Sequence, residues 1–130
     1  MPPPPTTSSS PDWTTTSRRP LWLAKLDQGE VLVARKGGQV LGWLRYGFFW
    51  DELPMMNMLF VVEELRGRGI GTALVTEWEK RLRAAGHTLV LTSTLASERG
   101  QFLYRKLGYV DCGALLLPGE PLEIILRKAL

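Results

Sequence analysis

The sequence predicts an α/β protein of the α+β type, with a mixed, largely antiparallel sheet and flanking helices. Short β-branched and apolar runs bounded by glycine turns recur in the first half of the chain and near its end. Between them the period changes to four residues, and Ile70, Leu74, Trp78 and Leu82 form one apolar stripe. Beyond about residue 55, strands and helices alternate, which favours helices packed on a sheet.

The 130 residues are enough for one domain and too few for two. Residues 1–17 are mostly Pro, Ser and Thr, so we predict a disordered tail there and a single domain over residues 18–130. The first apolar piece, Pro20–Asp27, favours a short helix over an edge strand. Gln28 and Gly29 end it.

The first strands form a hairpin. Glu30–Lys36 and Gln39–Trp50 are rich in β-branched and aromatic residues, and Gly37-Gly38 between them is a typical hairpin turn. Met55–Val62 follows Pro54 and is short enough to be a buried strand.

The apolar stripe predicts a helix from Ile70 to Ala85, ended by Gly86. His87–Ser93 then has the pattern of a buried strand.

A second helix is expected through Leu107, capped by Ser97 or a residue nearby, with Gly108 as its end. Tyr109–Leu117 and Leu122–Leu126 are the last predicted strands, joined by a Pro-Gly-Glu-Pro turn.

Charge and composition exclude several classes of protein. The net charge of +3 is mild, and the acids and bases of one helix are interspersed, which indicates a solvated face rather than a nucleic-acid surface: Glu77, Glu79, Lys80, Arg81 and Arg83. No apolar run is long enough to span a membrane, and the N-terminus does not resemble a signal peptide. One cysteine and one histidine exclude an internal disulfide and a Cys/His metal site, so we expect a cytoplasmic protein without a metal.

The segment from Leu59 to Leu74 has the features of a phosphate site. A strand runs into a glycine-rich turn, and a helix begins directly after it. Unpaired amides at a helix start attract anions, and Gly67, Gly69 and Gly71 allow the backbone to approach a ligand closely. Arg66 and Arg68 add guanidinium donors for phosphate oxygens. The pattern predicts a pyrophosphate site.

Two common phosphate motifs do not match. A Walker A loop needs Gly-Lys-Ser/Thr, whereas Gly71 is followed by Thr72 and Ala73. A dinucleotide-binding fold needs a third glycine where Thr72 stands, and an acid after the next strand, where the chain has Thr92, Ser93 and Thr94.

The glycine-rich segment resembles another motif. Arg66-Gly67-Arg68-Gly69-Ile70-Gly71 is similar to the Arg/Gln-x-x-Gly-x-Gly/Ala signature of the GCN5-related N-acetyltransferase (GNAT) superfamily. Tyr104-Arg105-Lys106-Leu107-Gly108-Tyr109 resembles the second signature of that superfamily, Tyr-x-x-x-Gly-Phe/Tyr. Both motifs stand in the expected order and at the expected distance, and the resemblance extends from about Glu30 to the C-terminus.

The resemblance implies acetyl-CoA as co-substrate and transfer of its acetyl group to a primary amine. It implies a pyrophosphate bound at the helix start, a pantetheine arm along the preceding strand, and Tyr104 as proton donor to the departing thiolate. The expected cofactor-binding residues are Leu59, Phe60, Val61, Arg66, Gly67, Arg68, Gly69, Ile70, Gly71, Thr72, Ser97 and Tyr104.

The acceptor side departs from the family pattern. Asn57 stands where relatives often carry an acid; it can hold a water or the amine but cannot accept a proton. The nearest carboxylates, Asp51 and Glu52, follow Trp50, and we expect these three residues to bind a cationic amine. A compact aromatic pocket favours a small molecule over a protein tail, although a protein or peptide amine remains an alternative.

The family normally has a strand and two helices before the hairpin, whereas this chain has only Trp13–Gly29. The resemblance therefore implies a shortened N-terminal part, and a homodimer could complete the substrate wall. Two other classes remain: a CoA-binding regulatory module that has lost transfer, and a nucleic-acid-binding protein, whose affinity would fall steeply with salt.

Overall fold

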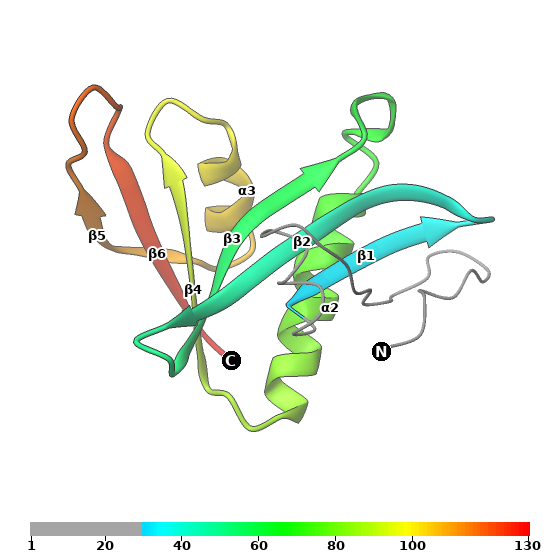
Figure 1. The fold of residues 1–130 in the computed structure, drawn as a ribbon, viewed down its shortest axis with the longest axis horizontal. Helices are drawn as coiled ribbons and strands as arrows, with labels where there is room; N and C mark the ends of the chain where they lie inside the picture. The colour runs from blue at the N-terminus through cyan, green and yellow to red at the C-terminus, as the bar shows by residue number, and fades with distance from the viewer. Residues whose placement is uncertain (1–29) are drawn as a thin grey trace.

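The computed structural model describes residues 30–130. The expected tail and the expected helix at Pro20–Asp27 lie outside the described residues. Figure 1 shows a twisted sheet with helices on one face. The sheet order is β1-β2-β3-β4-β6-β5, and all neighbours are antiparallel except β3 and β4. This confirms the predicted mixed, largely antiparallel sheet. The elements are β1 (Val31–Lys36), β2 (Gln39–Phe49), β3 (Leu53–Val61), η1 (Glu63–Leu65), α2 (Ile70–Ala84), β4 (Leu89–Leu95), α3 (Gly100–Lys106), β5 (Val110–Leu115) and β6 (Glu123–Ala129).

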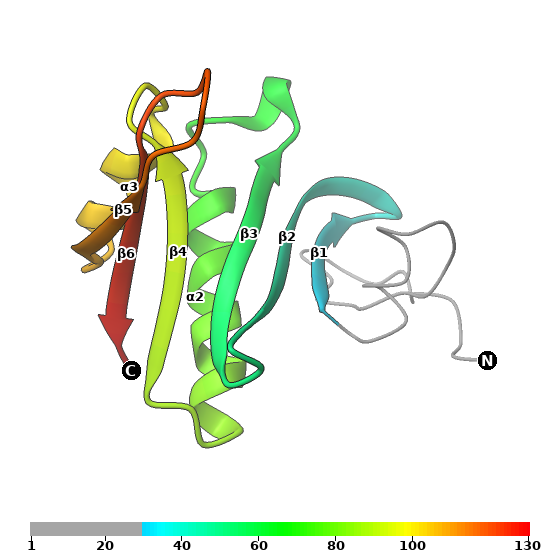
Figure 2. The same cartoon turned by 60° about the vertical axis from the view of Figure 1, so that its left-hand side comes forward.

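The core lies between α2 and the sheet. The predicted apolar stripe is buried, with Leu74 fully enclosed and Trp78 2% exposed. The stripe packs with Leu44 of β2 and Leu126 of β6 in one cluster that also includes Tyr104 of α3. Figure 2 shows α2 running behind the central strands, with α3 beside it over β4 and β6. The same core therefore fixes α2, which follows the glycine-rich turn, and α3, which contains Tyr104 of the second signature.

One charged residue of α2 was wrongly expected on a solvated face. Glu79 is only 5% exposed, because its side chain points from α2 toward Tyr109 and toward Lys128 of β6. Its two oxygens accept hydrogen bonds from Tyr109 Oη at 2.7 Å and Lys128 Nζ at 2.8 Å. These partners offset the cost of burying the carboxylate.

β3 and β4 separate soon after they meet. They pair only at Met55–Leu91 and Met56–Thr92. Figures 1 and 2 show the two strands diverging beyond this point. On its other edge, β3 carries a bulge at Asn57. Tyr46 of β2 pairs with Met56 and its neighbour Arg45 pairs with Met58, so Asn57 is the extra residue between the two pairs. Bulges bend a strand and redirect its side chains, so the bulge coincides with the point of divergence.

Several predicted boundaries were wrong. β2 ends at Phe49, and Trp50 and Asp51 form the turn to β3 with positive φ angles of 56° and 58°. The second helix begins at Gly100, and no side chain caps it, so Ser97 does not play the predicted capping role. The turn before α3 is held differently, because Glu98 Oε1 accepts a hydrogen bond from the Leu95 amide at 3.0 Å.

Candidate active site

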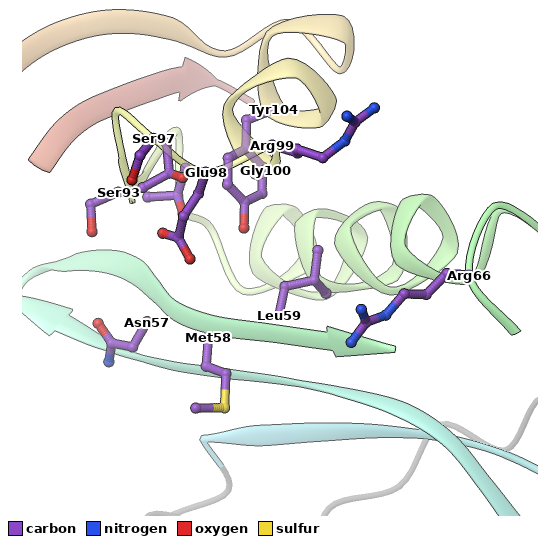
Figure 3. A pocket seen from close by; sticks show the side chains of 12 residues that line it. Asn57, Met58, Leu59, Arg66, Ser93, Ser97, Glu98, Arg99, Gly100 and Tyr104 are labelled. Atoms are coloured by element: carbon purple, nitrogen blue, oxygen red, sulfur yellow. The ribbon is translucent and has the colours of Figure 1, made fainter. Parts of the chain in front are cut away.

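A cavity of about 680 Å³ opens where β3 and β4 separate. Its size lies in the range of small-molecule sites, about 300–1,000 Å³. The walls come from β3, the end of β4, the turn before α3 and α3 itself (Figure 3). The lining residues are Asn57, Met58, Leu59, Arg66, Thr92, Ser93, Thr94, Ser97, Glu98, Arg99, Gly100 and Tyr104.

The glycine-rich turn presents free backbone donors at the start of α2. Gly67 and Gly69 have φ angles of 79° and 83°, in the left-handed region that glycine tolerates. Gly69 is the N-cap of α2, and no side chain caps the helix. Within the described part of the chain, the amides of residues 67–72 donate to no backbone carbonyl, and the first that does is Ala73, to Gly69 at 2.9 Å. Such an end favours an anion.

Arg66 links this turn to the cavity. Its Nε donates to the carbonyl of Val61 at 2.9 Å, and its guanidinium lies over the Phe60 ring at 5.5 Å from the centroid. These contacts hold the side chain at the cavity wall, where Figure 3 shows it beside the end of β3. The terminal nitrogens of the guanidinium remain as forked donors for phosphate oxygens.

The edge of β3 that faces the cavity has unpaired backbone. β4 offers no partner to residues 57–61, although β2 pairs with the other edge. An extended ligand can bind such an edge as an added strand. Leu59 lines the cavity, whereas Phe60 stacks on Trp43 at 4.5 Å between centroids and lies outside the lining, as does Val61. The structure therefore does not bring the predicted residues Phe60 and Val61 into the cavity lining.

Tyr104 of α3 lines the cavity and is 7% exposed. Burial raises the pKa of its phenol, and the nearby charge of Glu98 adds to the rise, while hydrogen bonding with the Thr92 side chain partly offsets it. A phenol of ordinary pKa is already protonated at neutral pH, and the raised pKa extends this to higher pH. Tyr104 can therefore donate a proton but is a poor base.

The structure brings together most of the predicted site residues. Asn57, Leu59, Arg66, Ser97 and Tyr104 line one cavity. The glycine turn, with Gly67, Arg68, Gly69, Ile70, Gly71 and Thr72, forms the start of α2 just after Arg66.

The expected acceptor residues do not join this cavity. Trp50, Asp51 and Glu52 form the β2–β3 turn, at the opposite end of β3 from its divergent part (Figure 1). They were expected near the site because they precede Asn57 closely in sequence, but an extended strand carries them away from it. The sequence analysis missed Glu98, although its place directly after Ser97 in the turn before the second signature was the available signal.

The parts of this site define a class: an α/β protein with unpaired amides at the start of α2 that suit an anionic ligand, and with the phenol of Tyr104 in the adjoining cavity. The sequence profile of the acetyltransferase (GNAT) domain matches residues 27–111, more than half of the chain. The chain belongs to the GNAT acetyltransferase family.

Two curated relatives are named as uncharacterized N-acetyltransferases. An uncharacterized N-acetyltransferase of Chlorobaculum tepidum is 33% identical over 82 residues, covering 63% of this chain and 50% of the relative. One of Methanocaldococcus jannaschii is 27% identical over 97 residues, covering 69% of this chain and 43% of the relative. The chain thus spans about half the length of the curated relatives it matches.

Solved structures share the fold. The ribosomal-protein-alanine N-acetyltransferase of Brucella melitensis has a TM-score of 0.70 and 27% identity, over 84% of this chain and 75% of that one. A candidate streptothricin acetyltransferase of Bacillus anthracis, solved with acetyl coenzyme A, has a TM-score of 0.71 and 16% identity, over 77% of this chain and 61% of that one. In the described part of this chain, no helix is long and apolar enough to cross a membrane. Residues 30–130 likewise hold no cluster of metal-binding side chains.

Proposed function

We propose that the protein transfers an acetyl group from acetyl-CoA to a primary amine, most simply a small molecule. One observation carries the proposal. Free amides at the start of α2, the guanidinium of Arg66 and the protonated phenol of Tyr104 adjoin or line a single cavity with an unpaired strand edge. Those are the requirements for holding a phosphorylated thioester and protonating its leaving group.

The residues present fit acetyl-CoA. The amides of residues 67–72 and Arg66 would hold the pyrophosphate, and the free edge of β3 would pair with the pantetheine amides. When bound, acetyl-CoA supplies the acetyl thioester. The cavity volume of about 680 Å³ suits a thioester arm and a compact acceptor.

The chain's own residues would then order the proton transfers. Unpaired amides of β3 beyond Met56 can donate to the carbonyl oxygen as it gains negative charge. Asn57 can orient the attacking nitrogen or a water that takes its proton. Tyr104 holds a proton at Oη for the departing sulfur, and the phenol regains a proton from the attacking nitrogen by way of water.

A protein N-terminal amine is the second candidate acceptor. The Brucella protein, described as a ribosomal-protein-alanine N-acetyltransferase, covers more of this chain at higher identity than the Bacillus anthracis protein. The compact cavity nevertheless favours a small amine.

The test is acetyl-CoA turnover, followed by thiol release, with polyamines, amino acids, aminoglycosides, arylalkylamines and peptides that carry free amines. Melting temperature with and without CoA is measured alongside. Turnover that falls in Tyr104→Phe supports transfer and names the acceptor class. A CoA-induced melting shift without turnover on any amine favours a regulatory module. No shift would contradict the phosphate site itself.

A further inference from the structure

The cavity contains one carboxylate that the proposed reaction does not use. Among the described residues that line the cavity, Glu98 is the single acid; the same lining includes Arg66 and Arg99 and neutral polar side chains such as Asn57, Ser93 and Ser97. Figure 3 shows the Glu98 carboxylate and the Tyr104 hydroxyl pointing side by side toward β3, whereas Arg99 turns away from the gap. The negative charge therefore stands next to the proposed proton donor.

The position of Glu98 is fixed by local hydrogen bonds. Its Oε1 accepts from the Leu95 amide at 3.0 Å. Gln101 Nε2 donates to the carbonyls of Ala96 at 2.8 Å and Glu98 at 2.9 Å, which closes the same turn. Within residues 30–130, Oε2 has no hydrogen-bond or ion-pair partner. One oxygen thus holds the turn, and the other is available to a ligand.

An exposed apolar surface adjoins the same turn. The leucine rim comprises Leu115, Leu116, Leu117 and Leu122, which are between 38% and 86% exposed, and lies at the β5–β6 loop. The Leu122 carbonyl accepts a hydrogen bond from the Ala96 amide at 2.7 Å, so the β5–β6 loop is attached to the turn that carries Glu98. Figure 2 shows both loops at the same end of the sheet. Contiguous exposed apolar patches are common binding surfaces, and this one lies beside the cavity rather than in its described wall.

We propose that Glu98 binds the ammonium group of the acceptor and that the leucine rim binds its apolar part. The acceptor class is then a monocationic amine that carries an aromatic or alkyl group. A polyamine fits less well, because the described lining has one acid and two arginines, Arg66 and Arg99. This inference rests on the proposed acetyl transfer, since it identifies the substrate of the same site.

The decisive variant is Glu98→Gln. Glutamine keeps the shape and the Oε1 acceptor for the Leu95 amide, so the turn is retained while the charge is lost. Calorimetry in the presence of CoA measures binding of phenethylamine, of its uncharged match 2-phenylethanol, and of spermidine, without requiring turnover. We expect wild type to prefer phenethylamine to spermidine, and Glu98→Gln to bind phenethylamine about tenfold or more weakly, with 2-phenylethanol unaffected.

Each half of the proposal has a control variant: Glu120→Gln for the acid, and Phe102→Ser for the leucine rim. Glu120→Gln removes an exposed acid from the β5–β6 turn outside the cavity and should leave phenethylamine binding unchanged. Leu116→Ser should weaken binding of phenethylamine and 2-phenylethanol alike, whereas Phe102→Ser removes an exposed aromatic from α3 and should not.

Equal phenethylamine affinity in Glu98→Gln and wild type, or a preference for spermidine, would overturn the inference. Failure of the proposed acetyl transfer would give a different result. Amine binding would still depend on Glu98, but no amine would release thiol from acetyl-CoA.

Discussion

The phenol of Tyr109 donates to Glu79 Oε2 across 2.7 Å in the interior of the protein. Lys128 completes the arrangement, with Nζ 2.8 Å from Oε1 and 5.6 Å from the centroid of the Tyr109 ring. Glu79 belongs to α2, and the other two residues lie next to α3 and on β6. This network therefore ties the helix of the phosphate site to the far part of the sheet.

Glu79→Ala should be among the most destabilising substitutions in the chain. It leaves the partly buried ammonium of Lys128 and the buried phenol of Tyr109 without their shared partner, at a cost of about 3–5 kcal/mol in the free energy of unfolding. Tyr109→Phe removes one hydrogen bond and leaves the ion pair, at about 1–2 kcal/mol. Urea denaturation measures both. Glu77→Ala, which removes an exposed pair with Arg81, should cost under about 0.5 kcal/mol, and an equal loss in Glu77→Ala and Glu79→Ala would contradict the argument.

Alkaline pH should destabilise the fold through its tyrosines. The pKa is raised in Tyr46, Tyr104 and Tyr109, with burial as the largest cause in each, and in Tyr109 the hydrogen bond to Glu79 adds to the rise. The folded state thus keeps phenol protons that the unfolded chain releases near pH 10, so this stability is full below about pH 10 and is lost as pH rises further. The urea midpoint should fall as pH rises above about pH 10, and less steeply in Tyr109→Phe.

Absorbance of tyrosinate gives an independent check of the same claim. The signal should appear together with unfolding rather than before it, because the buried phenols are not ionised while the protein is folded. Tyrosinate that forms at about pH 10 in a folded protein, as a free phenol would, contradicts the raised pKa values.

Two glycines of the turn should respond in opposite ways to alanine. Gly69 has a φ of 83°, and no atom lies within 4 Å of an added Cβ, so backbone strain alone makes Gly69→Ala cost about 1–2 kcal/mol. At Gly71 an added Cβ would meet Leu103 at 3.6 Å and Leu59 and Val61 at 3.7 Å, which are ordinary contacts. Gly71→Ala should be neutral or stabilise by up to about 1 kcal/mol, because alanine favours the helix. Thermal melting distinguishes the two, and a reversed order would contradict the geometry of the turn.

Much of the structure around the glycine-rich turn could be predicted from the sequence. The glycine spacing, the strand before it and the stripe of α2 are local patterns, and local patterns determine where a helix begins. The second signature likewise placed Tyr104 one helix further on, and it lies in the cavity that contains Arg66.

The acceptor half depends on register and turns, which the sequence does not encode locally. The bulge at Asn57 is visible only from the pairing of β2 with β3. The start of α3 at Gly100 follows from hydrogen bonds of Glu98 and Gln101 rather than from a Ser97 cap, and these bonds direct Glu98 into the cavity. Glu79 was expected in solvent because its partners Tyr109 and Lys128 are distant in sequence.

Arg66 and Tyr104 should affect different steps, because Arg66 lies beside the free amides of the glycine-rich turn, whereas Tyr104 is a buried phenol in the cavity wall. Arg66→Ala removes the guanidinium beside the free amides of the turn and should raise the KM for acetyl-CoA about tenfold to a hundredfold with little change in kcat. Tyr104→Phe keeps the ring in the core and removes the proton donor, so kcat should fall about a hundredfold or more at nearly constant KM. Steady-state kinetics with the best amine measures both. A fall in kcat alone for Arg66→Ala would place Arg66 at the reacting atoms, and an unchanged kcat in Tyr104→Phe would show that another group protonates the thiolate.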